Sequence, residues 1–256
     1  HRQVGNTAAV KLVPKDSRGP RLISAEPAER QFLQQGLMAC MVEILESHPM
    51  TTGRVNFTDQ TVNQRLAILA SKEQGYATLD LKDASDRVSM DLVNTLFGRT
   101  ELRDLIDHVR SAYTTLPNGQ HLRLNKHSPM GTALCFPVMA ACIWAILVSY
   151  LLGITGDFDY AIENVYVYGD DIICPSVHAP GLSYCLELFG LKVNRDKSFV
   201  ASPFAESCGV DAFRGEDVTP TRMRTLWGLF VGDKFTRAKA LVSIVAHARS
   251  LQKSGY

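Results

Sequence analysis

An uncharged stretch of 29 residues, from position 128 to position 156, restricts the fold of this 256-residue chain more than any other feature. The stretch contains the apolar run 140–152 and is long enough to cross a bilayer as a helix. Against a membrane span, Pro137 lies inside the stretch, Gly131 and Gly153 bracket its apolar run, and few basic residues flank it. We therefore expect a buried core helix, with a membrane span as the alternative.

The composition is that of a globular protein. Hydrophobic residues make up 46% of the chain and charged residues 21%, which excludes collagen-like, disordered and disulfide-scaffold classes. The net charge of +1 excludes a generally basic coat for nucleic acid, so a polyanionic partner has to be met by a local patch. The cysteines form no Cys-x-x-Cys pair, which favours reduced thiols over a zinc knuckle or a thioredoxin site.

Hydrophobic periodicity predicts a mixture of helices and strands. Ser85 and Asp86 are expected to cap a helix that carries Val88 to Phe97. The other predicted helices lie at 29–45, 59–70, 102–113 and 181–191. The predicted strands lie at 10–13, 22–24, 76–81, 121–124 and 192–200, with a small hairpin formed by 207–213 and 218–220.

Acidic residues interrupt the apolar, strand-forming run at 164–175. Gly169 suits the first central position of a type II′ turn, so the run predicts a hairpin with Asp170 and Asp171 at its tip. Two adjacent carboxylates repel each other unless they are protonated or joined by a cation. Asp80 adds a third carboxylate near the end of the predicted strand 76–81. A ligand set made only of oxygens favours Mg²⁺ or Mn²⁺ over zinc.

This set of carboxylates favours nucleotidyl transfer. Two divalent ions about 4 Å apart stabilise the attacking and leaving oxygens of a phosphoryl displacement. A basic loop with Lys15, Arg18 and Arg21 precedes the acids, and this order suits a triphosphate and its metals. Taken singly, each aspartate can instead be a cap or turn residue, and the loop can be an ordinary solvated basic loop.

Six blocks of the sequence resemble, in the same order, the replicase catalytic subunit of single-stranded RNA bacteriophages (levivirus-like). The similarity extends from about Val10 to Pro220, which is most of the chain. The blocks are 13–27, 59–67, 80–89, 168–175, 194–198 and 203–209.

The resemblance implies an α+β fold, a right-hand polymerase palm in which helices back an antiparallel sheet, with partial fingers and the start of a thumb. Residues 1–75 would form the fingers portion with the basic triphosphate-binding loop. Residues 76–202 would form the palm with the catalytic aspartates, and residues 203–256 the primer-grip hairpin and the beginning of the thumb. The implied function is an RNA-directed RNA polymerase that replicates a viral single-stranded RNA genome. It would transfer nucleotides from NTPs to an RNA 3′-OH and release pyrophosphate, with two Mg²⁺ ions, or Mn²⁺ in their place.

The resemblance also implies roles for individual residues. Asp80 and Asp170 would be the principal metal ligands, with Asp171 beside them, while Lys15, Arg18 and Arg21 would face the incoming triphosphate. Lys197 lies where related polymerases carry a lysine proposed to protonate the leaving pyrophosphate, although a plain surface lysine is an equal alternative.

Residues 128–132 resemble the loop that positions the template and the ribose of the entering nucleotide. Thr132 stands where better-known members of the family carry Asn, so the residue that contacts the 2′-OH is left open. The candidates for this nucleotide-binding region are Ser85, Asp86, Ser128, Gly131 and Thr132.

The expected partners are the RNA template and product strand, nucleoside triphosphates, and host translation factors in a holoenzyme. No membrane span is expected, and the expected location is the cytoplasm of the bacterial host. A reverse transcriptase with a similar Tyr-x-Asp-Asp turn is the nearest alternative. Another alternative is a non-catalytic RNA-binding or membrane-anchored protein with structural acids. A third is a palm that is inactive alone, because catalytic subunits of this family are longer.

Overall fold

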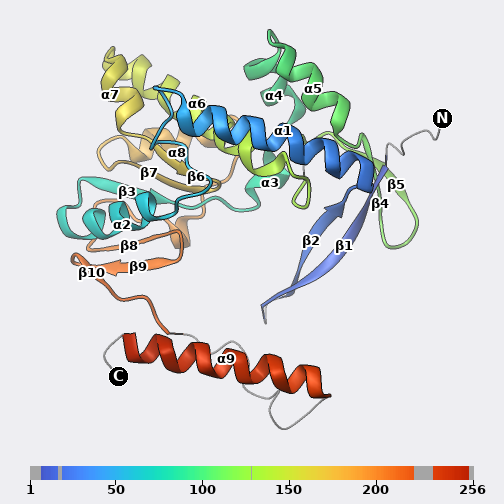
Figure 1. Ribbon diagram of the computed structural model, residues 1–256. Helices are drawn as coiled ribbons and strands as arrows, with labels where there is room; N and C mark the ends of the chain where they lie inside the picture. The colour runs from blue at the N-terminus through green and yellow to red at the C-terminus, as the bar shows by residue number, and fades with distance from the viewer. Residues whose placement is uncertain (1–6, 17–18, 128, 222–232, 254–256) are drawn as a thin grey trace. The chain divides into compact units, whose positions relative to one another are not determined.

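The computed structural model of the chain describes residues 7–16, 19–127, 129–221 and 233–253 (Figure 1). The chain divides into two compact units, His1–Asp217 and Val218–Tyr256. In the larger unit the described residues form three small sheets with helices packed against them, an α+β arrangement. In the smaller unit they form the helix α9 (Lys234–Lys253).

The central sheet has the strand order β3-β7-β6 and is antiparallel. Its strands are β3 (Tyr76–Leu79), β6 (Tyr166–Tyr168) and β7 (Asp171–Pro175). Tyr168 pairs with Asp171, so Gly169 and Asp170 form a two-residue turn. Of these two turn residues only Gly169 has a positive φ, +64°, as a type II′ turn requires. The predicted hairpin is therefore confirmed.

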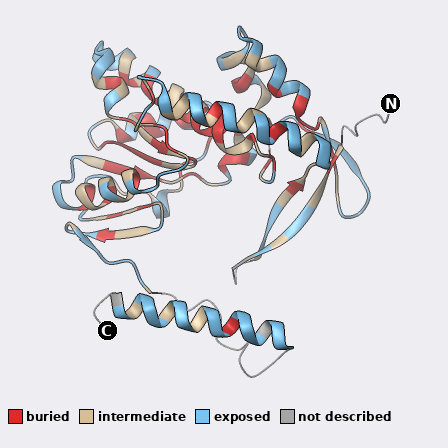
Figure 2. Cartoon of the chain, in the orientation of Figure 1, coloured by how far each residue is buried: buried red, intermediate tan, exposed pale blue. Residues whose placement is uncertain are grey.

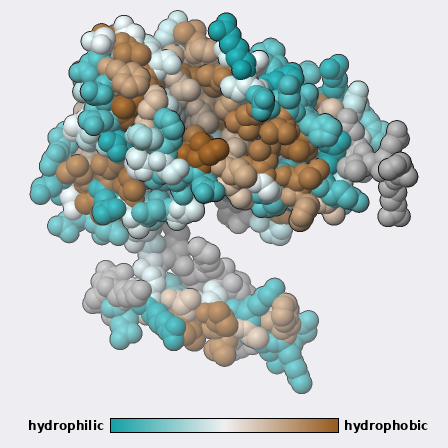
Figure 3. Space-filling view, turned by 45° about the horizontal axis from the view of Figure 1, so that its top comes forward, coloured by the Kyte–Doolittle hydropathy of each residue, from teal (hydrophilic) through white to brown (hydrophobic). Residues whose placement is uncertain are grey.

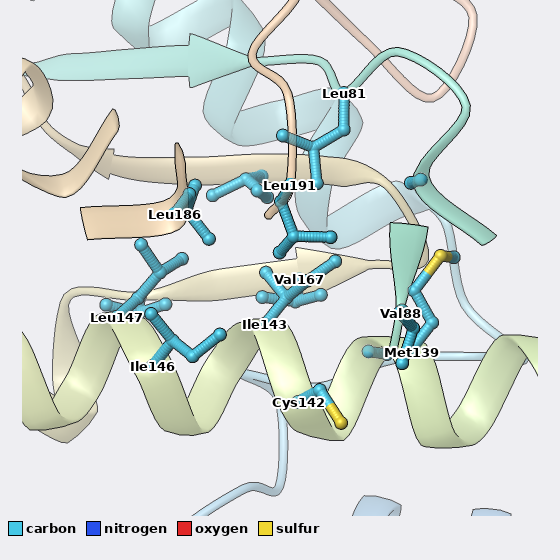
Figure 4. Packing of buried hydrophobic residues seen from close by; sticks show 14 of the residues in the cluster. Leu81, Val88, Met139, Cys142, Ile143, Ile146, Leu147, Val167, Leu186 and Leu191 are labelled. Atoms are coloured by element: carbon cyan, nitrogen blue, oxygen red, sulfur yellow. The ribbon is translucent and has the colours of Figure 1, made fainter. Parts of the chain in front are cut away.

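The helix α6 (Cys135–Thr155) packs on one face of this sheet and forms the centre of the core. Ile143 and Leu147 are fully buried and point from α6 toward Val167 and Leu186 (Figure 4). Leu186 belongs to α8 (Ala179–Leu188), which packs beside α6. By length and composition α6 also qualifies as a membrane span, but 56% of its apolar window is buried inside the protein. The expectation of a buried core helix is confirmed.

The opposite face of the sheet is covered by α2 (Thr61–Glu73) and a second sheet. That sheet contains β8 (Phe204–Ser207), β9 (Val210–Phe213) and β10 (Glu216–Asp217). Small side chains at Ala67, Ala70 and Ala205 let these elements approach closely, beside Tyr76 of β3. The predicted hairpin of 207–213 with 218–220 was wrong in its boundaries. The turn lies at Cys208 and Gly209, which both have positive φ, and β9 already ends at Phe213.

A third sheet has the order β2-β1-β4-β5. It consists of β1 (Thr7–Asp16), β2 (Gly19–Ala25), β4 (Tyr113–Thr115) and β5 (His121–Arg123), and the hairpin β1–β2 is largely exposed (Figure 2). The helix α1 (Ala28–Ser47) follows β2, and its buried Gln34 donates a 2.9 Å hydrogen bond to the carbonyl of Val109, at the end of α5 (Glu101–Val109). Exposed apolar side chains of α1 include Phe32, Leu33 and Ile44, and apolar patches interrupt the polar surface in Figure 3.

Local predictions were wrong at three further places. Ser85 and Asp86 lie inside the short helix α3 (Ala84–Arg87) and do not cap the next helix. Residues 192–200 are not a strand, because their polar centre forms the 3₁₀ turn η1 (Arg195–Lys197). Single bridges join Phe199 to Thr78 of β3 and Val193 to Leu81, two residues beyond its end. The helix predicted at 102–113 ends at Val109, and Tyr113 begins β4. The short helix α7 (Phe158–Glu163) follows α6.

Ser89 is the residue that caps α4 (Met90–Phe97), since its hydroxyl accepts a 3.1 Å hydrogen bond from the amide of Leu92. We expect Ser89→Ala to lower the free energy of unfolding by about 1 kcal/mol, because a helix-terminal amide loses its partner. Urea unfolding measures this change. Ser47→Ala, at an exposed helix position, is the matched control and is expected to change stability by no more than about 0.5 kcal/mol. Equal effects of the two substitutions would contradict the capping role.

Candidate active site

Asp80 follows β3 directly, at the edge strand of the central sheet. Its side chain is half-buried, and its Oδ2 accepts a 2.6 Å hydrogen bond from Nδ2 of Asn194. Its backbone amide donates to the hydroxyl of Ser198 at 3.1 Å, and its carbonyl accepts from the amide of Asn194 at 2.8 Å. The segment 193–199 therefore fixes both the backbone and the carboxylate of Asp80.

The turn Gly169–Asp170 is held by aromatic packing from α6. Phe136 makes edge-to-face contacts with Tyr168 and Phe57, at ring-centroid distances of 5.3 Å and 5.7 Å. A Cβ placed on Gly169 would lie 2.1 Å from Cε2 of Phe136. The ring can approach this closely only because residue 169 has no side chain, and so Phe136 sets the position of the acidic turn.

Asp171 begins β7 and faces α2 and β8, because alternation along the strand turns Ile172 toward α6. Its Oδ1 accepts a hydrogen bond from the Ser207 hydroxyl at 3.4 Å, and its Oδ2 accepts one from the Cys208 thiol at 3.7 Å. Asn63 of α2 donates through Nδ2 to the carbonyl of Asp171 at 3.3 Å. The carboxylate is thus held on the side of the sheet covered by α2 and β8.

The three aspartates are close enough to influence one another electrostatically. Burial, and after it the charges of Asp170 and Asp80, raise the pKa of Asp171 to about 6 against the hydrogen bonds from Cys208, which lower it. Burial also raises the pKa of Asp80; the Asn194 hydrogen bond opposes this shift and the charge of Asp170 adds to it. The structure therefore brings together Asp80, Asp170 and Asp171, as the sequence predicted.

The raised pKa of Asp171 predicts a pH-dependent stability. The folded carboxyl titrates at about 6 and an unfolded one near 3.8, so the folded state binds the proton first as the pH falls. Between pH 7 and pH 5, without divalent cations, we expect the free energy of unfolding to rise by about 1 kcal/mol from this group. Urea unfolding at the two pH values measures the rise, and Asp171→Asn should remove it. Identical pH dependence in the parent and the variant would contradict the assignment.

Lys197 lies in η1, near the acids, with a half-exposed side chain. Its Nζ forms a 3.1 Å ion pair with Oε1 of Glu206 on β8. Partial burial lowers the pKa of this amine, but the bond to Glu206 and the charges of Glu206, Asp80 and Asp171 outweigh the burial, so the net shift is upward. Lys197 is therefore a protonated group at the rim of the acidic cluster.

Residues at the start of α3 and α6 form a second cluster near Asp170. Ser85 lies beside the Cys135 thiol, whose pKa is raised to about 12 by burial and by the charges of Asp86 and Asp170. Lys126 forms a close ion pair with Asp86. The structure thus places Ser85 and Asp86 near the acidic turn.

The loop before α6 contacts the N-terminal sheet. The amide of Ser24 on β2 donates a 2.7 Å hydrogen bond to the carbonyl of Met130, and Gly131, with φ +105°, would collide with the Ser24 carbonyl if it carried a Cβ. Thr132 is buried, and its hydroxyl donates to the Pro129 carbonyl at 2.7 Å. In this structure the Thr132 hydroxyl caps its own loop.

Among the predicted triphosphate-binding residues, Arg21 is the one whose side chain the structure describes. Arg21 lies exposed on β2, opposite Val13 of β1. Within the described parts of the chain, no hydrogen bond or ion pair joins Arg21 to an acidic residue of the site. Arg18 and Ser128 lie outside the described residues, and so does the side chain of Lys15.

The donors of the acidic cluster suit a hard divalent cation, since they are carboxylates whose mutual repulsion a cation would relieve. Over the described ranges, however, no group of three His, Cys, Asp or Glu side chains already has the spacing of a metal site. The residues therefore suit a divalent cation by their chemical type and by their proximity. To coordinate an ion, the carboxylates have to move closer to one another.

Sequence reasoning missed several residues that position the aspartates: Asn63, Phe136, Asn194 and Ser198. Asn194 and Ser198 fall in the block that contains Lys197, which was the one available signal for them. Asn63 falls in block 59–67 of the same resemblance, whereas nothing in the sequence connected Phe136 with the acids.

Comparison with solved structures identifies the fold. The RNA-dependent RNA polymerase of a human picobirnavirus, an insertion-loop deletion mutant, superposes with a TM-score of 0.61 at 11% identity, over 94% of this chain and 53% of that one. Telomerase from Candida tropicalis superposes with a TM-score of 0.59 at 13% identity, over 96% and 52%. The chain has the α+β fold of nucleic-acid polymerases, which confirms the predicted fold class.

Sequence comparison then gives the family. The model of the RNA replicase beta-chain family matches residues 1–229, and the chain belongs to this family. The RNA-directed RNA polymerase beta chain of Enterobacteria phage fr is 37% identical over 82% of this chain, and that of Escherichia phage MS2 is 37% identical over 85%. The subunit beta of Escherichia virus Qbeta is 36% identical over 83%. The chain spans about a third of the length of these relatives, 36%, 37% and 34%.

Proposed function

We propose that this chain is the catalytic part of an RNA-directed RNA polymerase, a nucleotidyltransferase that replicates a bacteriophage RNA genome. One observation carries the proposal: Asp80, Asp170 and Asp171 converge at the end of β3 and the tip of the β6–β7 hairpin, in a member of the RNA replicase beta-chain family. The reaction transfers a nucleoside monophosphate from an NTP to an RNA 3′-OH and releases pyrophosphate.

In this proposal Asp80, Asp170 and Asp171 hold two Mg²⁺ ions, or Mn²⁺ in their place. When bound, the ions supply positive charge to the triphosphate and favour displacement at its α-phosphate. Asn194 orients the carboxylate of Asp80, and the Phe136 ring fixes the turn that carries Asp170. Lys197, held protonated by Glu206 and the aspartates, gives a proton to the leaving pyrophosphate after exchanging its partner Glu206.

Other residues bind the nucleotide. Ser85 and Asp86 lie near Asp170, where an entering ribose would lie, and Gly131 lets the loop before α6 approach β2. Thr132 would have to leave Pro129 before its hydroxyl contacted a ribose. Lys15, Arg18 and Arg21 contact the triphosphate, and Ser128 completes the loop. These assignments keep the division into fingers (1–75), palm (76–202) and primer-grip hairpin with the start of the thumb (203–256).

The proposed partners are an RNA template and product strand, NTPs, and host translation factors that complete a holoenzyme in the bacterial cytoplasm. This chain spans about a third of the length of these relatives. In the proposal, the rest of that length supplies further surfaces for the template and the partners.

Reverse transcription is the second candidate, because telomerase shares the fold. The replicase family favours RNA synthesis. The deciding experiment supplies the chain, with and without host translation factors, with a primed RNA template, Mg²⁺ and labelled ribonucleotides or deoxyribonucleotides. We expect template-dependent incorporation of ribonucleotides. Preference for deoxyribonucleotides, or no incorporation under any of these conditions, would overturn the proposal.

A further inference from the structure

The turn between β8 and β9 has a conformation that its sequence does not favour. Ser207 pairs with Val210, so Cys208 and Gly209 are the two turn residues, and their φ angles are +47° and +77°. A two-residue turn with both φ angles positive is normally built from Asn-Gly or Gly-Gly. A cysteine in the left-handed region is strained, and such residues gather where a function requires them.

The Cys208 side chain contacts the acidic site. Its thiol donates to Oδ2 of Asp171 at 3.7 Å, while the hydroxyl of the buried Ser207 donates to Oδ1 at 3.4 Å. Each oxygen of Asp171 therefore receives one hydrogen bond from this turn. A carboxylate has about four lone-pair sites, so both oxygens keep acceptor capacity for a cation.

The turn is itself anchored to α2. Asn63, which is fully buried, donates through Nδ2 to the Asp171 carbonyl at 3.3 Å and to the Ser207 hydroxyl at 3.5 Å. Gln64 donates through Nε2 to the Cys208 carbonyl at 3.0 Å. Two neighbouring side chains of one helix thus hold both the turn and the aspartate that the turn contacts.

We propose that Cys208, together with Ser207 and Asn63, is a positioning residue that fixes the carboxylate of Asp171 for binding a divalent cation. The left-handed conformation of Cys208 places its thiol against Oδ2 of Asp171. The conformational cost of the turn is therefore offset by the fixed position that the thiol gives to this carboxylate. This inference rests on the proposed function, because it requires that Asp171 bind the cation.

The test measures Mn²⁺ affinity by electron paramagnetic resonance in the full chain and in four variants. Cys208→Gly removes the thiol and suits the turn, and Cys208→Ser restores a hydroxyl donor. Ala201→Gly is the matched control, since Ala201 is exposed and also left-handed, with φ +45°. Asp170→Asn identifies the Mn²⁺ bound at the acidic site.

We expect Cys208→Gly to weaken the Asp170-dependent Mn²⁺ affinity by about tenfold, the size of effect seen for outer-shell partners of metal ligands. Cys208→Ser should recover most of this loss, and Ala201→Gly should leave the affinity unchanged. The thermal midpoint of Cys208→Gly should be no lower than that of Ala201→Gly, which separates positioning from a structural role.

Unchanged Mn²⁺ affinity in Cys208→Gly would overturn this inference and leave the proposed function standing. A lower midpoint accompanying the loss of affinity would also overturn it, because the turn would then be only structural. If the parent chain binds no Mn²⁺ in an Asp170-dependent manner, the proposed metal site fails, and the inference fails with it.

Discussion

Asp170→Asn is expected to reduce Mg²⁺-dependent ribonucleotide incorporation by about a hundredfold to a thousandfold. Loss of one group that stabilises a transition state typically has an effect of this size. The substitution keeps the shape of the side chain at the tip of the β6–β7 hairpin and removes its charge. Because the charge of Asp170 raises the pKa of both Asp80 and Asp171, the variant should fold at least as stably as the parent. A primer-extension assay, paired with thermal unfolding, measures both effects.

The matched control for this prediction is Asp196→Asn. The Asp196 side chain is 85% exposed and forms an ion pair with Lys82 at 3.1 Å, an arrangement that contributes little to stability. It is expected to keep activity near that of the parent. If Asp170→Asn retained more than a tenth of the parent activity, or if the control lost as much, Asp170 would have no special role.

Gly169→Ala is expected to lower the free energy of unfolding by about 2–4 kcal/mol and to abolish incorporation. Two costs add at this position. Alanine is strained at φ +64°, and its Cβ would lie 2.1 Å from Cε2 and 2.8 Å from Cζ of the Phe136 ring. The ring is confined by Phe57 and Tyr168, so relief of the clash has to displace the acidic turn.

A matched glycine separates the two costs. Gly119 has φ +85° in the β4–β5 turn, and a Cβ there would meet nothing within 4 Å, so Gly119→Ala bears the conformational cost alone, about 1 kcal/mol. In a Phe136→Ala background, Gly169→Ala should cost no more than Gly119→Ala does. Chemical unfolding of the single and double variants measures this coupling, and additive effects would refute the contact between Gly169 and Phe136.

Short-range patterns were sufficient for much of the fold. The apolar, strand-forming residues on both sides of Gly169 and Asp170 predicted the β6–β7 hairpin, and the uncharged stretch predicted a core helix, because each pattern reflects burial that the segment cannot avoid. Prediction failed where tertiary contacts override local preference. The apolar residues at both ends of 192–200 favoured a strand, but the centre is polar, Asn194 and Ser198 bond to Asp80, and the segment forms the turn η1.

The acidic residues of the site were predictable, and the residues that position them were not. Asp170 stands out because it belongs to an acidic pair at a predicted turn between two apolar runs. Asp80 stands out because it is an acid near the end of an apolar predicted strand. Asn63 lies 108 positions from Asp171, and Phe136 looks like any other core residue of an apolar helix. Their roles depend on which faces of the sheet α2 and α6 cover, and this follows from the complete packing.

The pairing of Tyr168 with Asp171 also determines which changes of chain length the protein can accept. One residue inserted or deleted in β7 would exchange the two faces of the strand, so that a carboxylate would enter the apolar layer against α6 and Ile172 would face Ser207. By contrast, the exposed turn at Asn118 and Gly119 can lengthen without moving a buried side chain. Descendants of this chain are therefore free to drift in loop length at the β4–β5 turn, whereas the hairpin that carries the acids has to keep its number of residues.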